Sequence, residues 1–195
     1  MQLAELKMRF LLQSVTAARV LPMLAPPKKL VQAAVLMPFF QTRSGAQLLL
    51  TRRAAHLNAH PGQISFPGGK HEGRDGDLIT TALRETQEEI GIHTEQIEVL
   101  GCLHSNHTLS GFSITPVVAI IHGAFTPTLD KNEVAECFSV PWQHLMQAQH
   151  RHTAKFRRQG QDMTVGFIPY QDKFIWGATA AMIDQLALQL ADAVQ

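Results

Sequence analysis

The residues from Phe66 to Gly91 read FPGGKHEGRDGDLITTALRETQEEIG. The second half of this stretch places three glutamates close together, Glu85, Glu88 and Glu89. On an α-helix, which advances by about 100° per residue, Glu89 lies about 40° to one side of Glu85 and Glu88 about 60° to the other. The three carboxylates therefore share one face. Because hard divalent cations prefer carboxylate oxygens, the pattern indicates a metal site and chemistry on a phosphate substrate.

The segment around these acids carries the signals of a turn followed by a helix. Asp75 and Asp77 stand where a helix over about 78–90 would begin, and Gly91 stands just past its end. The Pro-Gly-Gly run at 67–69 predicts a sharp turn whose backbone can approach a ligand closely. A solvated acidic face is the alternative for a glutamate-rich helix, and the glycine turn at this separation favours the metal site.

Composition limits the class of protein. The chain has 195 residues, 45% of them hydrophobic and 17% charged, which predicts one globular core. A formal net charge of +1 gives no general reason to expect nucleic-acid binding. Two cysteines, Cys102 and Cys137, do not make a disulfide framework. We find neither a membrane-spanning apolar stretch nor the pattern of a signal peptide, so a cytoplasmic location is expected.

Hydrophobic periodicity and turn residues divide the rest of the chain. Residues 1–30 are expected to form an N-terminal helix, over 3–20, and a proline-containing linker, and residues 31–195 to form one domain. A final helix is expected over about 177–194. Strands are predicted over 33–40, 47–53, 63–66, 97–103, 115–121 and 135–140. Strands with few helices indicate a mixed α/β (α+β) class, with helices packed on a sheet.

The spacing of the glycine turn and the acidic helix resembles the Nudix box of the Nudix hydrolases. Two positions depart from the box. Asp75 stands where the box has its first glutamate, one residue further from Arg84 than usual, and Thr86 replaces an aliphatic residue. Arg84 is expected to brace the acids. The matching residues are Gly69, Arg84, Glu85, Glu88, Glu89, Gly91 and Ile92.

The segments before the box narrow the resemblance. The runs 49–54 and 62–69 are similar to the signature of the coenzyme A pyrophosphatase branch, which also has a lengthened box. That branch usually has an arginine where this chain has Asn58. Further matches lie at 115–118, 133–134 and 174–177, so the resemblance covers about residues 33–190.

The resemblance implies a Nudix-like α/β/α sandwich with a mixed sheet, and Mg²⁺ or Mn²⁺ as cofactor. Carried onto this chain, it implies metal binding by Glu85, Glu89 and Glu88 with the Gly69 carbonyl, and catalysis by Glu85 and Glu88. Glu133, outside the box, is a further candidate for the base that takes a proton from the attacking water.

The implied reaction cleaves the pyrophosphate of coenzyme A, or of its derivatives, into 3′,5′-ADP and (acyl-)4′-phosphopantetheine. The 3′-phosphate of this small-molecule substrate needs basic partners, and Arg52, Arg53 and Lys70 flank the box. The polar segment 104–112 is expected to be a loop that lines the pantetheine arm.

Several alternatives stay open. Another Nudix substrate, such as ADP-ribose or a dinucleoside polyphosphate, would use the same box, and a non-catalytic Nudix domain would act as a ligand sensor. Cys102, His104 and His107 make a weak zinc signal because no fourth ligand is near. The charge balance and the N-terminal helix suit a homodimer as well as a monomer.

Overall fold

The computed structural model describes residues 1–13, 30–158 and 161–192. Its helices are α1 (Leu3–Gln13), α2 (Leu78–Ile90), α3 (Trp142–Met146) and α4 (Ala178–Asp192), with short 3-10 turns η1 (Thr94–Gln96) and η2 (Ala148–His150). Its strands are β1 (Val31–Thr42), β2 (Gly45–Arg53), β3 (Ile64–Ser65), β4 (Gly68–Lys70), β5 (Ile97–Cys102), β6 (Asn106–His107), β7 (Phe112–Ile121), β8 (Val134–Pro141), β9 (His152–Arg158), β10 (Gln161–Tyr170) and β11 (Lys173–Trp176).

The main sheet is mixed and is built around β1. Strand β1 runs parallel to β7, from the pair Val31 and Phe112 to the pair Phe39 and Ile120. On its other side β1 pairs antiparallel with β4 and then with β2. Strand β2 continues between β3 and β8. The interiors of β1 and β7 are apolar on both faces because layers cover the sheet on both sides.

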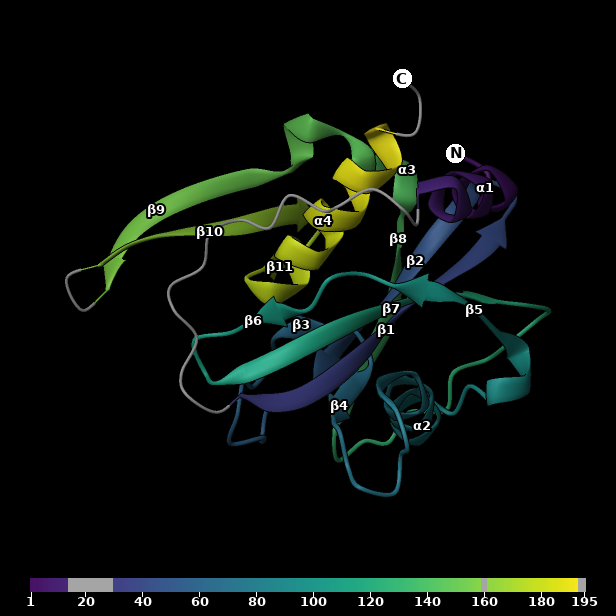
Figure 1. Cartoon of the computed structure of the whole chain (residues 1–195), viewed down its shortest axis with the longest axis horizontal. Coiled ribbons are helices and arrows are strands. Elements are labelled where there is room, and N and C mark those ends of the chain that lie inside the picture. Colours follow the sequence, from purple (N-terminus) through teal and green to yellow (C-terminus); the bar gives the residue numbers. More distant parts are fainter. Residues whose placement is uncertain (14–29, 159–160, 193–195) are drawn as a thin grey trace.

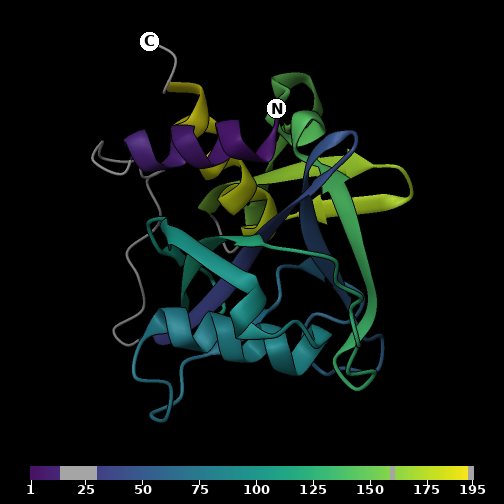
Figure 2. The same cartoon turned by 90° about the vertical axis from the view of Figure 1, so that its right-hand side faces the viewer.

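Helices cover the two faces of the main sheet (Figure 1). Helix α2 packs on one face, where Ala82 and Ile90 are fully buried, whereas α1 and α4 lie on the other, as Figure 2 shows from the side. Leu6 and Phe10 of α1 belong to the same core cluster as Trp142 and the apolar face of α4. The expected α/β/α sandwich with a mixed sheet is confirmed.

A second, three-stranded antiparallel sheet extends from this body (Figure 1). It consists of β9, β10 and β11, and the face that carries Ile168 and Ile175 joins the core beside α4. None of these strands was among the strands that we predicted from the sequence. The segment 104–112, expected to be a loop, contains β6, a short strand that pairs with β7.

The two ends of the chain agree in part with the expected elements. Helix α1 covers the first part of the helix expected over 3–20, and the rest of that helix and the proline linker lie outside the described residues. Helix α4 matches the helix expected over 177–194 up to Asp192. No helix in the described part of the chain is long and apolar enough to cross a membrane.

Candidate active site

Helix α2 carries the acids, and its two ends are fixed by the signals seen in the sequence. The Asp77 carboxylate accepts a hydrogen bond from the Thr80 backbone N–H at 2.7 Å, which caps the N-terminus. Gly91 adopts a left-handed conformation with φ 69° and closes the C-terminus. The buried Thr86 hydroxyl donates to the Ala82 carbonyl at 2.7 Å, so a threonine satisfies its polar group in a position that is aliphatic in the box.

The run 67–69 was expected to be a turn, but Gly68 and Gly69 belong to strand β4, where they pair with β1. This glycine segment lies directly against two of the acids. Gly69 packs on the Glu85 carboxylate so closely that a Cβ at position 69 would stand 2.5 Å from Glu85 Oε1. The neighbouring Gly68 N–H donates to Glu89 Oε2 at 3.3 Å. Strand β4 therefore brings backbone polar groups and two carboxylates into one small volume.

Arg84 is held by a buried aspartate. Its guanidinium contacts both oxygens of Asp75, through Nε at 2.7 Å and Nη2 at 3.1 Å. This contact, with the Glu72 N–H and the Thr81 hydroxyl as further donors, holds the pKa of Asp75 well below its usual range. The longer loop before the helix thus delivers a carboxylate that anchors the arginine.

The anchored arginine reaches the acids of the helix. Arg84 Nη1 lies 2.9 Å from Glu85 Oε1 and donates to Glu88 Oε2 at 2.7 Å. Arg84 therefore braces these acids, which is the expected arrangement. Arg74, which we did not single out in the sequence, lies 3.5 Å from the second oxygen of Glu88. Glu88 is half-exposed and faces the two arginines.

Glu89 occupies the most unfavourable position for a charge. It is only 4% exposed, and its burial raises the pKa to about 8. The nearby carboxylates of Glu133 and Glu85 contribute to the rise, whereas Gly68 and Arg53 oppose it. Glu133, an exposed residue of the β7–β8 loop, is therefore brought to the acids by the fold. Burial also raises the pKa of Glu85.

These residues fit a hard divalent cation. Within the described ranges Glu89 makes no ion pair, so a buried carboxylate next to two others has an unmet need for positive charge. Glu85, Glu89 and the Gly69 carbonyl are oxygen donors of the kind that Mg²⁺ and Mn²⁺ prefer. In the described part of the chain no three acidic, histidine or cysteine side chains are grouped so that they could hold a metal ion by themselves, and Arg84 contacts oxygens of both Glu85 and Glu88.

The three basic candidates lie in different surroundings. Arg53 is close enough to Glu89 to oppose its pKa rise. Arg52, the residue before Arg53 in β2, points to the opposite face, where its Nε lies 3.3 Å from Glu136. Lys70 is exposed on β4, and its Nζ lies 5.9 Å from the centre of the Phe112 ring. The site thus gathers Arg53 beside the acids, and Lys70 follows the glycine segment.

A sequence model of the NUDIX domain matches residues 30–161, more than half of the chain. The chain belongs to the Nudix family. It is 42% identical over 159 residues to the protein named Uncharacterized Nudix hydrolase NudL of Enterobacter sp. (strain 638), with 82% of each chain covered. It is also 42% identical over 171 residues to the NudL of Pectobacterium atrosepticum, with 88% of each chain covered.

Solved Nudix structures share the fold. The Mycobacterium smegmatis Nudix hydrolase RenU superposes with a TM-score of 0.51 at 23% identity, over 58% of this chain and 72% of that one. A MutT/nudix family protein from Enterococcus faecalis gives a TM-score of 0.53 at 15% identity, over 88% of this chain and 66% of that one. The match to the NUDIX model and the NudL relatives identify the protein as a Nudix hydrolase, a member of a family of pyrophosphohydrolases that use divalent metals and act on small molecules.

Proposed function

We propose that this Nudix hydrolase cleaves the pyrophosphate bond of coenzyme A or its derivatives, giving 3′,5′-ADP and (acyl-)4′-phosphopantetheine. The observation that carries the proposal is the buried Glu89, which lies beside Glu85, Glu133 and Arg53 and makes no ion pair with any described residue. Three acids and one arginine at a glycine segment are suited to a substrate with phosphate groups and a metal ion.

The position of the branch-specific segments supports coenzyme A over other Nudix substrates. The run 49–54 covers the second half of β2, which ends at Arg53, and Ala54 after it. The run 62–69 covers β3 and the first two residues of β4. The Arg53 N–H donates to the Gln63 carbonyl at 3.0 Å, and the Ala54 N–H donates to the Glu133 carbonyl at 2.8 Å. Both segments are therefore part of the frame of the acidic site.

The acidic residues and the glycine carbonyl of the site are assigned to metal binding. We assign Glu85, Glu89 and the Gly69 carbonyl to metal binding, with Glu88 as a further ligand. Mg²⁺ or Mn²⁺, when bound, supplies positive charge for the pyrophosphate oxygens and lowers the pKa of a water.

Proton transfer and substrate binding fall to other side chains. Glu133 is our candidate for the general base because it is exposed and close to Glu89. Glu88 is the alternative base, and it would first have to leave its contacts with Arg84 and Arg74. Arg53 and Lys70 are the candidates for phosphate contacts, and Arg52 would have to exchange Glu136 for a phosphate.

A substrate panel tests the proposed function. Purified protein is incubated with Mg²⁺ or Mn²⁺ and either coenzyme A, ADP-ribose or a dinucleoside polyphosphate, and the products are identified by mass spectrometry. We expect 3′,5′-ADP and 4′-phosphopantetheine from coenzyme A, with the highest kcat/KM of the panel. A clear preference for ADP-ribose would refute the coenzyme A assignment.

A matched pair of variants tests the metal-binding acids. Glu89→Gln should abolish turnover while the protein stays folded, because the amide keeps the size of the side chain and loses its charge. Glu95→Gln, the same change at an exposed position in η1, should leave turnover as it is in the unmodified protein. Near-normal activity of Glu89→Gln would contradict the role given to this residue.

We also propose a cytoplasmic location, which the two free cysteines suit because reducing compartments keep thiols unpaired.

A further inference from the structure

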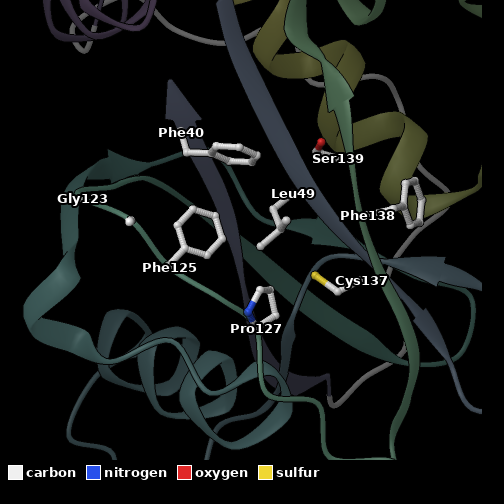
Figure 3. Close-up of a pocket in the computed structure, with 9 residues that line it drawn as sticks. Phe40, Leu49, Gly123, Phe125, Pro127, Cys137, Phe138 and Ser139 are labelled. Atoms are coloured by element: carbon white, nitrogen blue, oxygen red, sulfur yellow. The ribbon is translucent and has the colours of Figure 1, made fainter. Parts of the chain in front are cut away.

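A recess of about 430 Å³ lies beside β8, on the face of the main sheet that α2 covers. Figure 3 shows the rings of Phe40 and Phe125 next to each other, with Leu49 and the Cys137 sulfur facing the same space. The two rings meet edge to face with their centres 5.1 Å apart. The volume is in the range of small-molecule sites, and the lining residues, all in the described part of the chain, include none with a charge.

One loop joins the recess to the acidic site. The β7–β8 loop, residues 122–133, forms one wall of the recess with Ala124 and Phe125. It then follows the end of α2, where the Asp130 N–H donates to the Glu89 carbonyl at 3.0 Å, and it ends at Glu133. The wall of the recess and the candidate base therefore belong to the same short loop.

The pairing of β2 with β8 gives the distance between Arg53, beside the acidic site, and the recess. Arg53 pairs with Val134 across β2 and β8, and Thr51 pairs with Cys137. Because Thr51 precedes Arg53 by two residues, and the pairing of β2 with β8 shifts register between Arg52 and Arg53, the recess begins about 7 Å along β2 from the position of Arg53. A substrate whose phosphates lie at Arg53 must therefore extend along β8 to reach the recess.

The two ends of the proposed substrate differ in charge. Because the recess has no charged lining residue, this difference indicates which end fits it. The nucleotide end carries a 3′-phosphate and needs a cationic partner. The pantetheine arm is uncharged and ends in a thiol or, in acylated derivatives, in a thioester with an alkyl chain. A mostly apolar lining, in which Ser139 is the polar exception and no lysine or arginine takes part, matches the second end.

We propose that this recess binds the S-acyl group of acyl-coenzyme A, so that the enzyme prefers acylated coenzyme A to the free thiol. The inference rests on the proposed function, because it takes coenzyme A as the common part of the substrates. Each acyl methylene that enters the recess raises kcat/KM about fourfold, until the recess is full.

The test compares kcat/KM for coenzyme A, acetyl-, butanoyl- and hexanoyl-coenzyme A. In the unmodified protein the ratio of acylated to free substrate should rise with chain length. Ala124→Glu, which places a charge at the exposed rim of the recess, should bring the ratios close to one. Ala148→Glu, the same change on the exposed turn η2, should leave the ratios unchanged. Thermal denaturation of each variant checks that it is folded.

The outcomes separate the two proposals. Absence of turnover for all coenzyme A forms in the unmodified protein refutes the proposed function, and this inference with it. Turnover of all four substrates with equal kcat/KM refutes the acyl recess alone, and this result needs no variant. Ratios in Ala124→Glu that equal those of Ala148→Glu also refute it.

Discussion

The carboxylate of Glu85 lies against the α-carbon of Gly69, so that a methyl group on residue 69 would stand 2.5 Å from the carboxyl carbon of Glu85. Gly69→Ala must therefore displace Glu85, although the fold has no other reason to change. Since a shift of about 1 Å in a catalytic group can cost about 100-fold in rate, we expect a loss of that order. Steady-state kinetics measures the loss, and far-UV circular dichroism checks the fold. Normal kcat with Ala at position 69 would show that Glu85 can move without consequence.

Removing the charge of Asp75 should lower activity or metal affinity, although Asp75 is not one of the proposed metal ligands. Asp75→Asn keeps the shape of the side chain and loses the ion pair that fixes Arg84. Supporting residues of this kind typically contribute about 10- to 100-fold to activity or metal affinity, and we expect an effect in that range. A Mn²⁺ titration followed by kinetics measures it. If metal affinity and kcat both stay at the values of the unmodified protein, Arg84 is held in place by its other contacts.

The metal-free protein should become less stable as the pH rises. The pKa of Glu89 is raised to about 8 from 4.5, so the folded state binds a proton that the unfolded state has released between these values. The contribution of Glu89 to stability is thus full below about pH 4.5 and is lost as the pH approaches 8. We expect a lower Tm at pH 8 than at pH 6 in the presence of EDTA.

Glu89→Gln provides the comparison for this pH effect, because it cannot titrate. Its Tm should depend less on pH between 6 and 8 than the Tm of the unmodified protein, when both are measured in EDTA. An identical slope in the two proteins would assign the pH dependence to other groups.

Metal addition should reverse this loss of stability. A cation that binds only the folded state at 100 times its Kd contributes about 2.7 kcal/mol, so Mn²⁺ should raise the Tm clearly at pH 8. Glu89→Gln should lose most of this increase, and Glu95→Gln should keep it. Differential scanning fluorimetry with and without EDTA makes the measurement. An equal increase in both variants would place the stabilising metal elsewhere.

The two adjacent arginines of β2 should behave differently. Arg53→Ala removes a cation near Glu89, and we expect KM for coenzyme A to rise about tenfold or more, the size of a lost charge-assisted hydrogen bond. Arg52→Ala breaks a partly exposed pair with Glu136 and should change stability by about 1 kcal/mol or less, with a smaller effect on KM. Equal effects of the two changes on KM would contradict this division.

The elements predicted best from the sequence are those whose ends have strong local signals. Helix α2 begins and ends where we placed it, because Asp77 caps one end and Gly91 the other. The core strands β1, β2 and β7 begin two or three residues before the predicted runs, because these residues pair with neighbouring strands, as Val31 does with Phe112 and Gly45 with Thr42. The ends of strands are set by their neighbours, which a single sequence does not reveal.

The second sheet was missed for a related reason. Strand β9 is mostly polar and basic and gives no clear apolar alternation. Strand β10 does alternate, with Met163, Val165 and Phe167 at every second position, so this strand could have been predicted from the sequence. Pairing between the two strands, which is a property of the folded chain, defines this hairpin.

At the candidate site, the sequence predicted the arrangement of the three glutamates but not all of the contacts made by the residues around them. It brought Glu85, Glu88 and Glu89 to one helix face, but it did not show that Asp75 holds Arg84. It also treated Arg52 and Arg53 as one group, although adjacent residues of a strand point to opposite faces. That alternation is visible in the sequence once β2 is recognised, so this separation could have been predicted.

The contacts of Arg84 also matter for the metal-free protein. Arg84 lies within 3 Å of Glu85 and Glu88 as well as of Asp75, so the chain itself supplies part of the positive charge that these acids need. Folding therefore does not have to wait for a cation. We expect that the enzyme can be stripped of metal, stored and reloaded without passing through an unfolded state.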